Sequence, residues 1–284
     1  MNYRGAVITP LHDPQGAALL YFEKCADSVL SQEDTDFTWV ISIQEAHEDY
    51  TKLLRKIGLN QQVIIRKARS VRDLRSHLYE CLIDFREFDW IHILCQDDRY
   101  TFSNSLFMIA KTLEAVDFIS VKPLRAHGCE LEPHEPKSGK SNIALNQVRA
   151  RLEPMGINRI GGLSTIAFRS TRWRELNFSH NLLIDLELRR QLRSPNSLLP
   201  VLSGGLVTEV VWPGQSQFSL RSSSKSEFQS WVDSSKSGRL ESSRRVLVAD
   251  FYGFRELGDA WERSAFSGMG PIRFAASGLG RIRK

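Results

Sequence analysis

The stretch Trp90-Ile91-His92-Ile93-Leu94-Cys95-Gln96-Asp97-Asp98 (WIHILCQDD) decides how the rest of the sequence is interpreted. It begins as a short, mainly apolar run of the size of a buried strand, and two carboxylates follow at its end. Adjacent carboxylates repel each other unless a cation or hydrogen-bond donors compensate them. Hard oxygen ligands of this kind suit Mg²⁺ or Mn²⁺, above all where a diphosphate completes the coordination shell. A solvated turn after a strand is the alternative interpretation of the same pair.

Strand-like runs alternate with helix-like segments on both sides of this stretch. We expect strands at residues 4–9, 37–43, 63–65, 90–94 and 117–121, with amphipathic helices between them. This order predicts an α/β fold with a mostly parallel central sheet flanked by helices. Ligands of such sheets bind outside the carboxyl ends of the strands, so the loops that follow the strands are the candidate site.

The alternation stops after residue 121. Residues 122–160 are polar and irregular, and Gly161-Gly162 then precedes an expected strand at 163–168, a helix at 182–192 and a strand at 206–212. Residues 215–245 are rich in serine and basic side chains, and the tail is rich in glycine. We therefore expect one domain over residues 1–214 and an irregular C-terminal extension over residues 215–284.

The composition sets broad limits on the class of protein. The chain has 284 residues, of which 42% are hydrophobic and 10% aromatic, enough for a buried core. No apolar run approaches the roughly 18–20 residues of a membrane helix, and the N-terminus lacks a secretory pattern, so we expect a cytoplasmic protein. The net charge of +5 suits an anionic ligand, an acidic membrane surface or nucleic acid, and does not choose among them.

Four motifs occur in a fixed order along the first half of the chain. They are Thr9-Pro10-Leu11-His12-Asp13, Ser28-Val29-Leu30-Ser31-Gln32, Gln44-Glu45-Ala46-His47 and the aspartate pair. The order resembles that of the family 2 glycosyltransferases, nucleotide-sugar enzymes with a Rossmann-like GT-A fold, in which the aspartate pair is the metal and nucleotide motif. The resemblance covers residues 4–121 well and residues 160–192 more weakly.

The resemblance implies a role for each matching residue. For the nucleotide sugar it implies a nucleobase pocket lined by Pro10, Leu11 and His12, the base-binding position at Glu45, a nucleotide contact from Arg75, and a ribose and diphosphate contact from Asp97. For the cation, Mg²⁺ or Mn²⁺, it implies Asp98. Asp185 lies in a run, Ile184-Asp185-Leu186-Glu187-Leu188, that is similar to the family's general-base motif. Gly161-Gly162 matches the segment that approaches the acceptor.

The resemblance also implies a function. A hexosyltransferase-type enzyme would move a sugar from a nucleotide-diphosphate sugar to a glycan or lipid-linked acceptor, in polysaccharide biosynthesis, with metal assistance and inversion. Residues 1–121 would then be the nucleotide-binding half and residues 122–214 the acceptor half. The basic C-terminal segment suggests peripheral contact with the inner face of the membrane.

Two other functions stay open. Gln44-Glu45 replaces the family's Asp-Asp, Gln96 occupies the first position of the metal motif, and Ile184 replaces the glutamate beside the base. These departures motivate a second hypothesis, a catalytically impaired relative that binds a nucleotide or glycan as a scaffold. A nucleic-acid-binding module is the third hypothesis. The sequence disfavours it, and we expect no nucleic-acid partner, because basic residues are not interleaved with exposed aromatic residues on one sheet.

Overall fold

A computed structural model gives the structure of residues 3–69, 73–83, 87–127, 144–148, 162–176, 184–192 and 199–212. These residues belong to one compact unit, made of Met1–Arg149 and Ile160–Gln215. Gly161 and the predicted extension at residues 215–284 lie outside the described residues, so the domain boundary at residue 214 stays a prediction.

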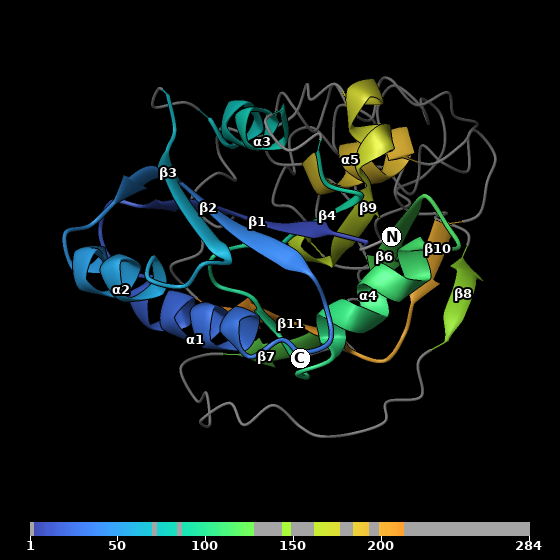
Figure 1. Cartoon of the computed structure of the whole chain (residues 1–284), viewed down its shortest axis with the longest axis horizontal. Helices are drawn as coiled ribbons and strands as arrows, with labels where there is room; N and C mark the ends of the chain where they lie inside the picture. Colours follow the sequence, from blue (N-terminus) through green and yellow to red (C-terminus); the bar gives the residue numbers. More distant parts are fainter. Residues whose placement is uncertain are drawn as a thin grey trace, which may run out of the picture. The chain divides into compact units, whose positions relative to one another are not determined.

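The large sheet has eight strands in the order β3-β2-β1-β4-β9-β6-β10-β8 (Figure 1). Their bounds are β1 Gly5–Asp13, β2 Phe37–Ala46, β3 Val63–Lys67, β4 Trp90–Ile93, β6 Phe118–Val121, β8 Leu145–Val148, β9 Ile166–Arg169 and β10 Leu199–Leu202. The pairings from β3 through β4 are parallel, as is β6 with β10, whereas β9 is antiparallel to β4 and β6 and β8 is antiparallel to β10. Six of these strands therefore point the same way, which confirms the expected mostly parallel sheet.

A smaller sheet lies beside the large one, and helices cover both faces of the large sheet. The small sheet has the order β5-β11-β7, with bounds Arg99–Tyr100, Val207–Val211 and Leu124–His127. The helices are α1 Leu19–Leu30, α2 Tyr50–Ile57, α3 Leu74–Ile83, α4 Ser105–Leu113 and α5 Ile184–Leu192, with 3₁₀ turns η2 Leu163–Thr165 and η3 Ser170–Glu175. Helices α1, α2 and α4 lie on one side of the large sheet and α3 and α5 on the other (Figure 1).

The main core forms between the first strands and the helices α1 and α4. Val7 and Leu11 of β1 are fully buried there with Phe22 of α1 and Leu106 of α4. Val7 and Leu11 share one face of β1 because side chains alternate along a strand. This packing fixes the direction of β1 and β4, and therefore the position of the loops at their carboxyl ends.

The first strand is longer than the sequence indicates. We expected it to end at Thr9 and residues 10–13 to form a loop, but β1 continues to Asp13 and pairs with β2 throughout. Its pairing with β4 ends at Ile8, so Pro10 lies where one side of the strand has no partner. Proline, which lacks an N–H donor, is tolerated at such edge-like positions.

The expected strand at residues 163–168 also differs from the structure. Residues 163–165 form the 3₁₀ turn η2, and the strand β9 begins only at Ile166. The Thr165 hydroxyl donates to the Gly162 carbonyl at 2.7 Å, and this local side-chain bond favours a turn over a ladder. Within the described residues, no helix is both long and apolar enough to cross a membrane.

Candidate functional site

The loop after β4 brings the aspartate pair to the carboxyl end of the parallel strands. Gln96 accepts the His12 backbone N–H at 2.8 Å, which links this loop to the end of β1. Asp97 Oδ2 accepts the indole N–H of Trp212 at 2.9 Å. The two oxygens of Asp98 accept the Ser164 hydroxyl at 2.5 Å and the Val210 backbone N–H at 2.9 Å. The pair is therefore an ordered part of the fold rather than a solvated turn.

Asp98 is surrounded by other negative charges in a desolvated position. Its side chain is buried, and burial raises its pKa well above the usual range. The charges of Asp97 and Glu209 raise that pKa further, whereas the bonds from Ser164 and Val210 lower it. We call Asp97, Asp98 and Glu209 the acidic cluster.

Ser164 holds the aspartate loop in place. Its hydroxyl accepts the Cys95 backbone N–H at 2.7 Å while it donates to Asp98. Its carbonyl lies 2.9 Å from Nε2 of the buried His92, whose Nδ1 lies 2.6 Å from the Tyr100 hydroxyl. A carbonyl can only accept, so Nε2 carries the proton in the neutral ring. Burial lowers the pKa of His92 to about 4, so that the ring stays neutral near pH 7.

Glu209 of β11 is a site residue that the sequence did not predict. Its carboxylate accepts the Gly162 backbone N–H, and Arg125 Nε lies 3.6 Å from its other oxygen. Burial raises the pKa of Glu209, and the charge of Asp185 raises it further. Glu209 therefore lies within electrostatic reach of both Asp98 and the predicted base, Asp185.

Asp185 lies in the first turn of α5, where its carboxylate is 3.9 Å from Arg189 NH1, one helical turn later. The Arg189 side chain is fully buried, with bonds to Ser120 Oγ at 3.0 Å and Thr165 Oγ1 at 2.8 Å. Asp185 acts electrostatically on Glu209, and Glu209 acts on Asp98, so the fold brings Asp185 to the same end of the sheet as the aspartate pair. Its role as base stays a prediction.

Of the residues predicted for the nucleotide sugar, Asp97 follows β4 and Arg75 lies in α3, and the others lie toward the carboxyl ends of β1 and β2. His12 is exposed and pairs in register with the exposed Glu45 of β2; we call these two the strand-end pair. Pro10 and Leu11 are buried within β1. Arg75 lies in the first turn of α3, where its NH2 is 3.3 Å from Asp73 Oδ2, and Asp73 caps that helix by accepting the Ser76 N–H at 2.8 Å.

Asp13 and Trp212 complete the polar surroundings of the site. Asp13 was not predicted to have a role, yet its carboxylate accepts the Ala18 N–H at 2.7 Å and the Tyr50 hydroxyl at 2.7 Å, which fixes the turn into α1. Trp212, whose indole N–H binds Asp97, stacks on Tyr21 with ring centroids 5.0 Å apart.

A lone acid inside a run rich in β-branched residues, as at Glu209 in Val207–Val211, is the sequence signal that could have indicated a buried carboxylate.

The donor set is compatible with a divalent cation that also binds a phosphate ligand. The acidic cluster carries hard oxygen atoms with mutual repulsion, which a cation would relieve. Within the described residues, no three His, Cys, Asp or Glu side chains are arranged to hold a metal ion by themselves. Mg²⁺ commonly binds to one or two carboxylates plus substrate phosphates, so Asp97 and Asp98 fit that type of site.

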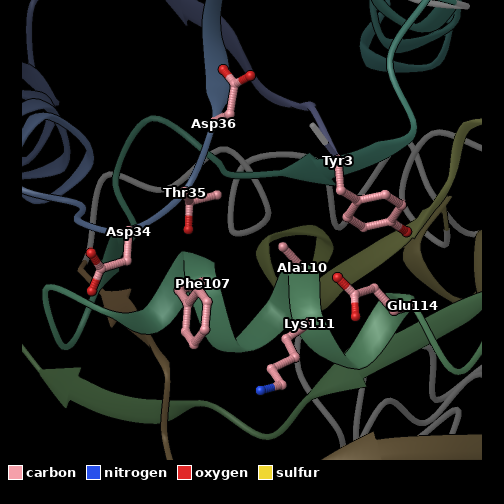
Figure 2. Close-up of a pocket in the computed structure, with 8 residues that line it drawn as sticks. All are labelled: Tyr3, Asp34, Thr35, Asp36, Phe107, Ala110, Lys111 and Glu114. Atoms are coloured by element: carbon pink, nitrogen blue, oxygen red, sulfur yellow. The ribbon is translucent and has the colours of Figure 1, made fainter. Parts of the chain in front are cut away.

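A hollow lies elsewhere in the described fold. It has a volume of about 540 Å³ and is lined by the residues before β1 and β2 and by one face of α4 (Figure 2). Tyr3, Asp34 and Asp36 lie on its strand side, and Phe107 and Glu114 on its helix side. It is therefore at the amino ends of these strands, away from the carboxyl ends that carry the predicted site.

Comparisons with known proteins reveal similarity in structure. No protein-family model and no curated protein matches the sequence. Residues 1–349 of TarS from S. aureus match with a TM-score of 0.56 and 11% identity, over 95% of this chain and 76% of that one. The same fragment in complex with UDP-GlcNAc matches with a TM-score of 0.50 and 12% identity, over 87% and 65% of the two chains. The mannosyltransferase PcManGT from Pyrobaculum calidifontis, in complex with GDP-Man and Mn²⁺, matches with a TM-score of 0.57 and 11% identity, over 98% and 79%.

These likenesses confirm the GT-A fold that the resemblance implied. The chain is thus an α/β protein with the architecture of nucleotide-sugar glycosyltransferases. At identities of 11–12% the similarity concerns the fold, and the chemistry must be argued from the residues themselves.

Proposed function

We propose that the chain is a glycosyltransferase that moves a sugar from a nucleotide-diphosphate sugar to a glycan or lipid-linked acceptor. One observation carries the proposal: Asp97, Asp98, Glu209 and Asp185 gather at the carboxyl end of the parallel strands of a GT-A fold. The matching structures of TarS with UDP-GlcNAc and of PcManGT with GDP-Man support a donor of this class.

The predicted residues divide the chemistry between them. Asp185 takes the proton of the acceptor hydroxyl, which has a very high pKa and needs a positioned base. The hydroxyl oxygen forms a bond to the anomeric carbon, and the bond from that carbon to the phosphate oxygen breaks, with its electron pair leaving on the nucleoside diphosphate. Attack from the face opposite the leaving group inverts the anomeric centre. Mg²⁺ or Mn²⁺ bound at Asp98 would supply neutralisation of the diphosphate charge.

Binding of the donor is the first test. The purified chain is titrated with UDP-GlcNAc, GDP-Man and other nucleotide sugars, with Mn²⁺ or EDTA, and donor hydrolysis is measured in parallel. Asp97→Asn is the site variant, because it keeps the size and one oxygen of the side chain. Asp36→Asn, in the hollow at the other end of the strands, is the matched control.

We expect Mn²⁺-dependent binding of at least one donor that weakens in Asp97→Asn and is unchanged in Asp36→Asn. If no nucleotide sugar binds in the presence of the metal, the enzyme proposal is wrong.

A scaffold function is the second candidate, and one contact favours it. Gln96, in the first position of the metal motif, has an amide in place of a carboxylate, and both ends of that amide bind the His12 backbone. Donor binding without any hydrolysis or transfer, in the same experiment, would identify a glycosyltransferase-like binding protein. The enzyme proposal includes two further points. The enzyme acts in polysaccharide biosynthesis, and residues 215–284 contact the membrane.

A further inference from the structure

Glu209 is the one charged residue of β11, whose other members are three valines and a threonine. Only 13% of its side chain is exposed, so its charge requires partners. One partner is Arg125, which pairs with it in register on β7 and lies 56% exposed. The other is the backbone N–H of Gly162, which donates to Oε1. A Cβ atom at position 162 would lie 3.3 Å from that oxygen, so the close approach favours glycine.

The peptide groups on both sides of Gly162 are held. While Glu209 binds the N–H, the carbonyl of Gly162 accepts the Thr165 hydroxyl at 2.7 Å and Arg189 NH2 at 3.4 Å. Arg189 belongs to α5 and is the residue that lies beside Asp185. Glu209 of β11 and Arg189 of α5 therefore form hydrogen bonds to the same turn.

The same turn leads directly to the aspartate loop. Two residues after Gly162, the Ser164 hydroxyl binds Asp98, and the residue after Glu209 donates its N–H to Asp98. A displacement of the Gly162 turn would therefore reach both Asp98, through Ser164, and Asp185, through Arg189.

We propose that Glu209 is a positioning residue, whose hydrogen bond to Gly162 holds the predicted base and the aspartate pair in their positions relative to each other. The inference rests on the proposed glycosyltransferase function. Misplacement of reacting groups by about 1 Å can lower a rate by about 100-fold, so a carboxylate that touches no reacting atom can still control turnover.

Two variants separate the hydrogen bond from the charge. Glu209→Gln keeps an oxygen that can accept the Gly162 N–H, whereas Glu209→Ala removes it. Glu48→Gln, at an exposed position before α2, is the matched control. The kcat and KM for hydrolysis are measured with UDP-GlcNAc or GDP-Man. The amide resonance and hydrogen exchange of Gly162 are followed in ¹⁵N-glycine-labelled protein and assigned with Gly162→Ala.

For Glu209→Ala we expect kcat to fall about 10- to 100-fold with the donor KM little changed, and Gly162 exchange to accelerate. Glu209→Gln should recover most of the lost kcat and protect the amide. Wild-type kcat in Glu209→Ala, or equal loss in both variants, overturns the inference, since the latter shows that the charge itself is required. If the wild type hydrolyses no donor, the proposed function fails instead. Gly162 exchange then decides the inference alone, and unchanged exchange in Glu209→Ala overturns it.

Discussion

The strand-end pair and the acidic cluster lie at the same end of one sheet but differ in how they are built. His12 and Glu45 are exposed and lie at the ends of two neighbouring parallel strands. In the acidic cluster, by contrast, Asp98 is buried and both of its oxygens are hydrogen-bonded within the protein. The difference indicates that substitutions at Asp98 act on folding and donor binding together, whereas substitutions in the strand-end pair act on ligand preference alone.

The largest effect is expected from removal of the Asp98 carboxylate. Asp98→Ala leaves the Ser164 hydroxyl and the Val210 N–H without an acceptor in a buried position, so the free energy of unfolding should fall by about 2–3 kcal/mol. Donor turnover should fall by about 100-fold or more if the cation binds there. Urea unfolding and donor hydrolysis measure the two effects.

Asp98→Asn separates these two effects, because its amide oxygen still accepts one of the two bonds. It should lose less stability than Asp98→Ala and nearly as much turnover. An Asp98→Ala protein as stable as the wild type would show that these hydrogen bonds do not hold the cluster together, and the contrast with the strand-end pair would disappear.

The next effect concerns pH and the buried His92. Its pKa is lowered to about 4 from an ordinary value of 6.5, so the unfolded chain binds more protons than the folded one between these values. The free energy of unfolding contributed by this group therefore falls as the pH is lowered from about 6.5 to about 4, by up to about 3 kcal/mol. His92→Gln, which cannot titrate, should lack this component of the pH dependence.

The measurement is urea unfolding of both proteins at several pH values from 7.5 to 4.5. Asp98, whose raised pKa gives the opposite slope, is present in both, so it cancels in the difference between them. Parallel pH profiles of the two proteins would contradict a neutral, buried His92 behind Ser164.

The sequence predicted the fold better than it predicted the contacts of the site. Apolar runs depend on local chemistry, and the strands β2, β4 and β6 begin at or within one residue of the expected positions. The strand β9 was expected, but its antiparallel insertion between β4 and β6 was not, because pairing partners are set by packing far along the chain. Asp97 and Asp98 were predicted as site residues because two acids come soon after an apolar strand, and their roles stay predictions.

Residues that act through distant partners escaped prediction. Ser164 meets Asp98 across 66 positions of sequence, and Val210 meets it across 112. The hydrophobic pattern of the sequence does not predict such contacts, since they depend on how the segments around β9 and β11 are placed near the loop after β4. The burial of Pro10 and Leu11 within β1 was also missed, because the proline suggested a strand end where the structure has a one-sided strand.

A smaller effect is expected at Trp212, whose indole N–H binds Asp97 of the acidic cluster. Trp212→Phe removes the N–H that Asp97 accepts but keeps a ring to stack on Tyr21. We expect a loss of about 1 kcal/mol in the free energy of unfolding, and donor affinity weakened by about 5-fold because Asp97 is less well oriented. Tyr21→Phe, which keeps the stack and the indole, is the control. Urea unfolding measures the stability, and calorimetric titration with UDP-GlcNAc or GDP-Man measures the affinity. If Trp212→Phe and Tyr21→Phe gave the same values, the indole N–H would have no role in orienting Asp97.

The smallest effect is expected at Glu45, in the exposed strand-end pair. Glu45→Asp installs the residue type that the resembled family has at this position and shortens the side chain by one methylene. Because the group is exposed, unfolding should be unchanged, whereas the ratio of KM values for UDP-GlcNAc and GDP-Man should shift by about 2- to 5-fold. Glu48→Asp, which is also exposed but lies outside the pair, should leave the ratio unaltered. A loss of stability in Glu45→Asp would mean that the two regions are held by one network, because a side chain that only selects the nucleotide has no partner in the fold to lose.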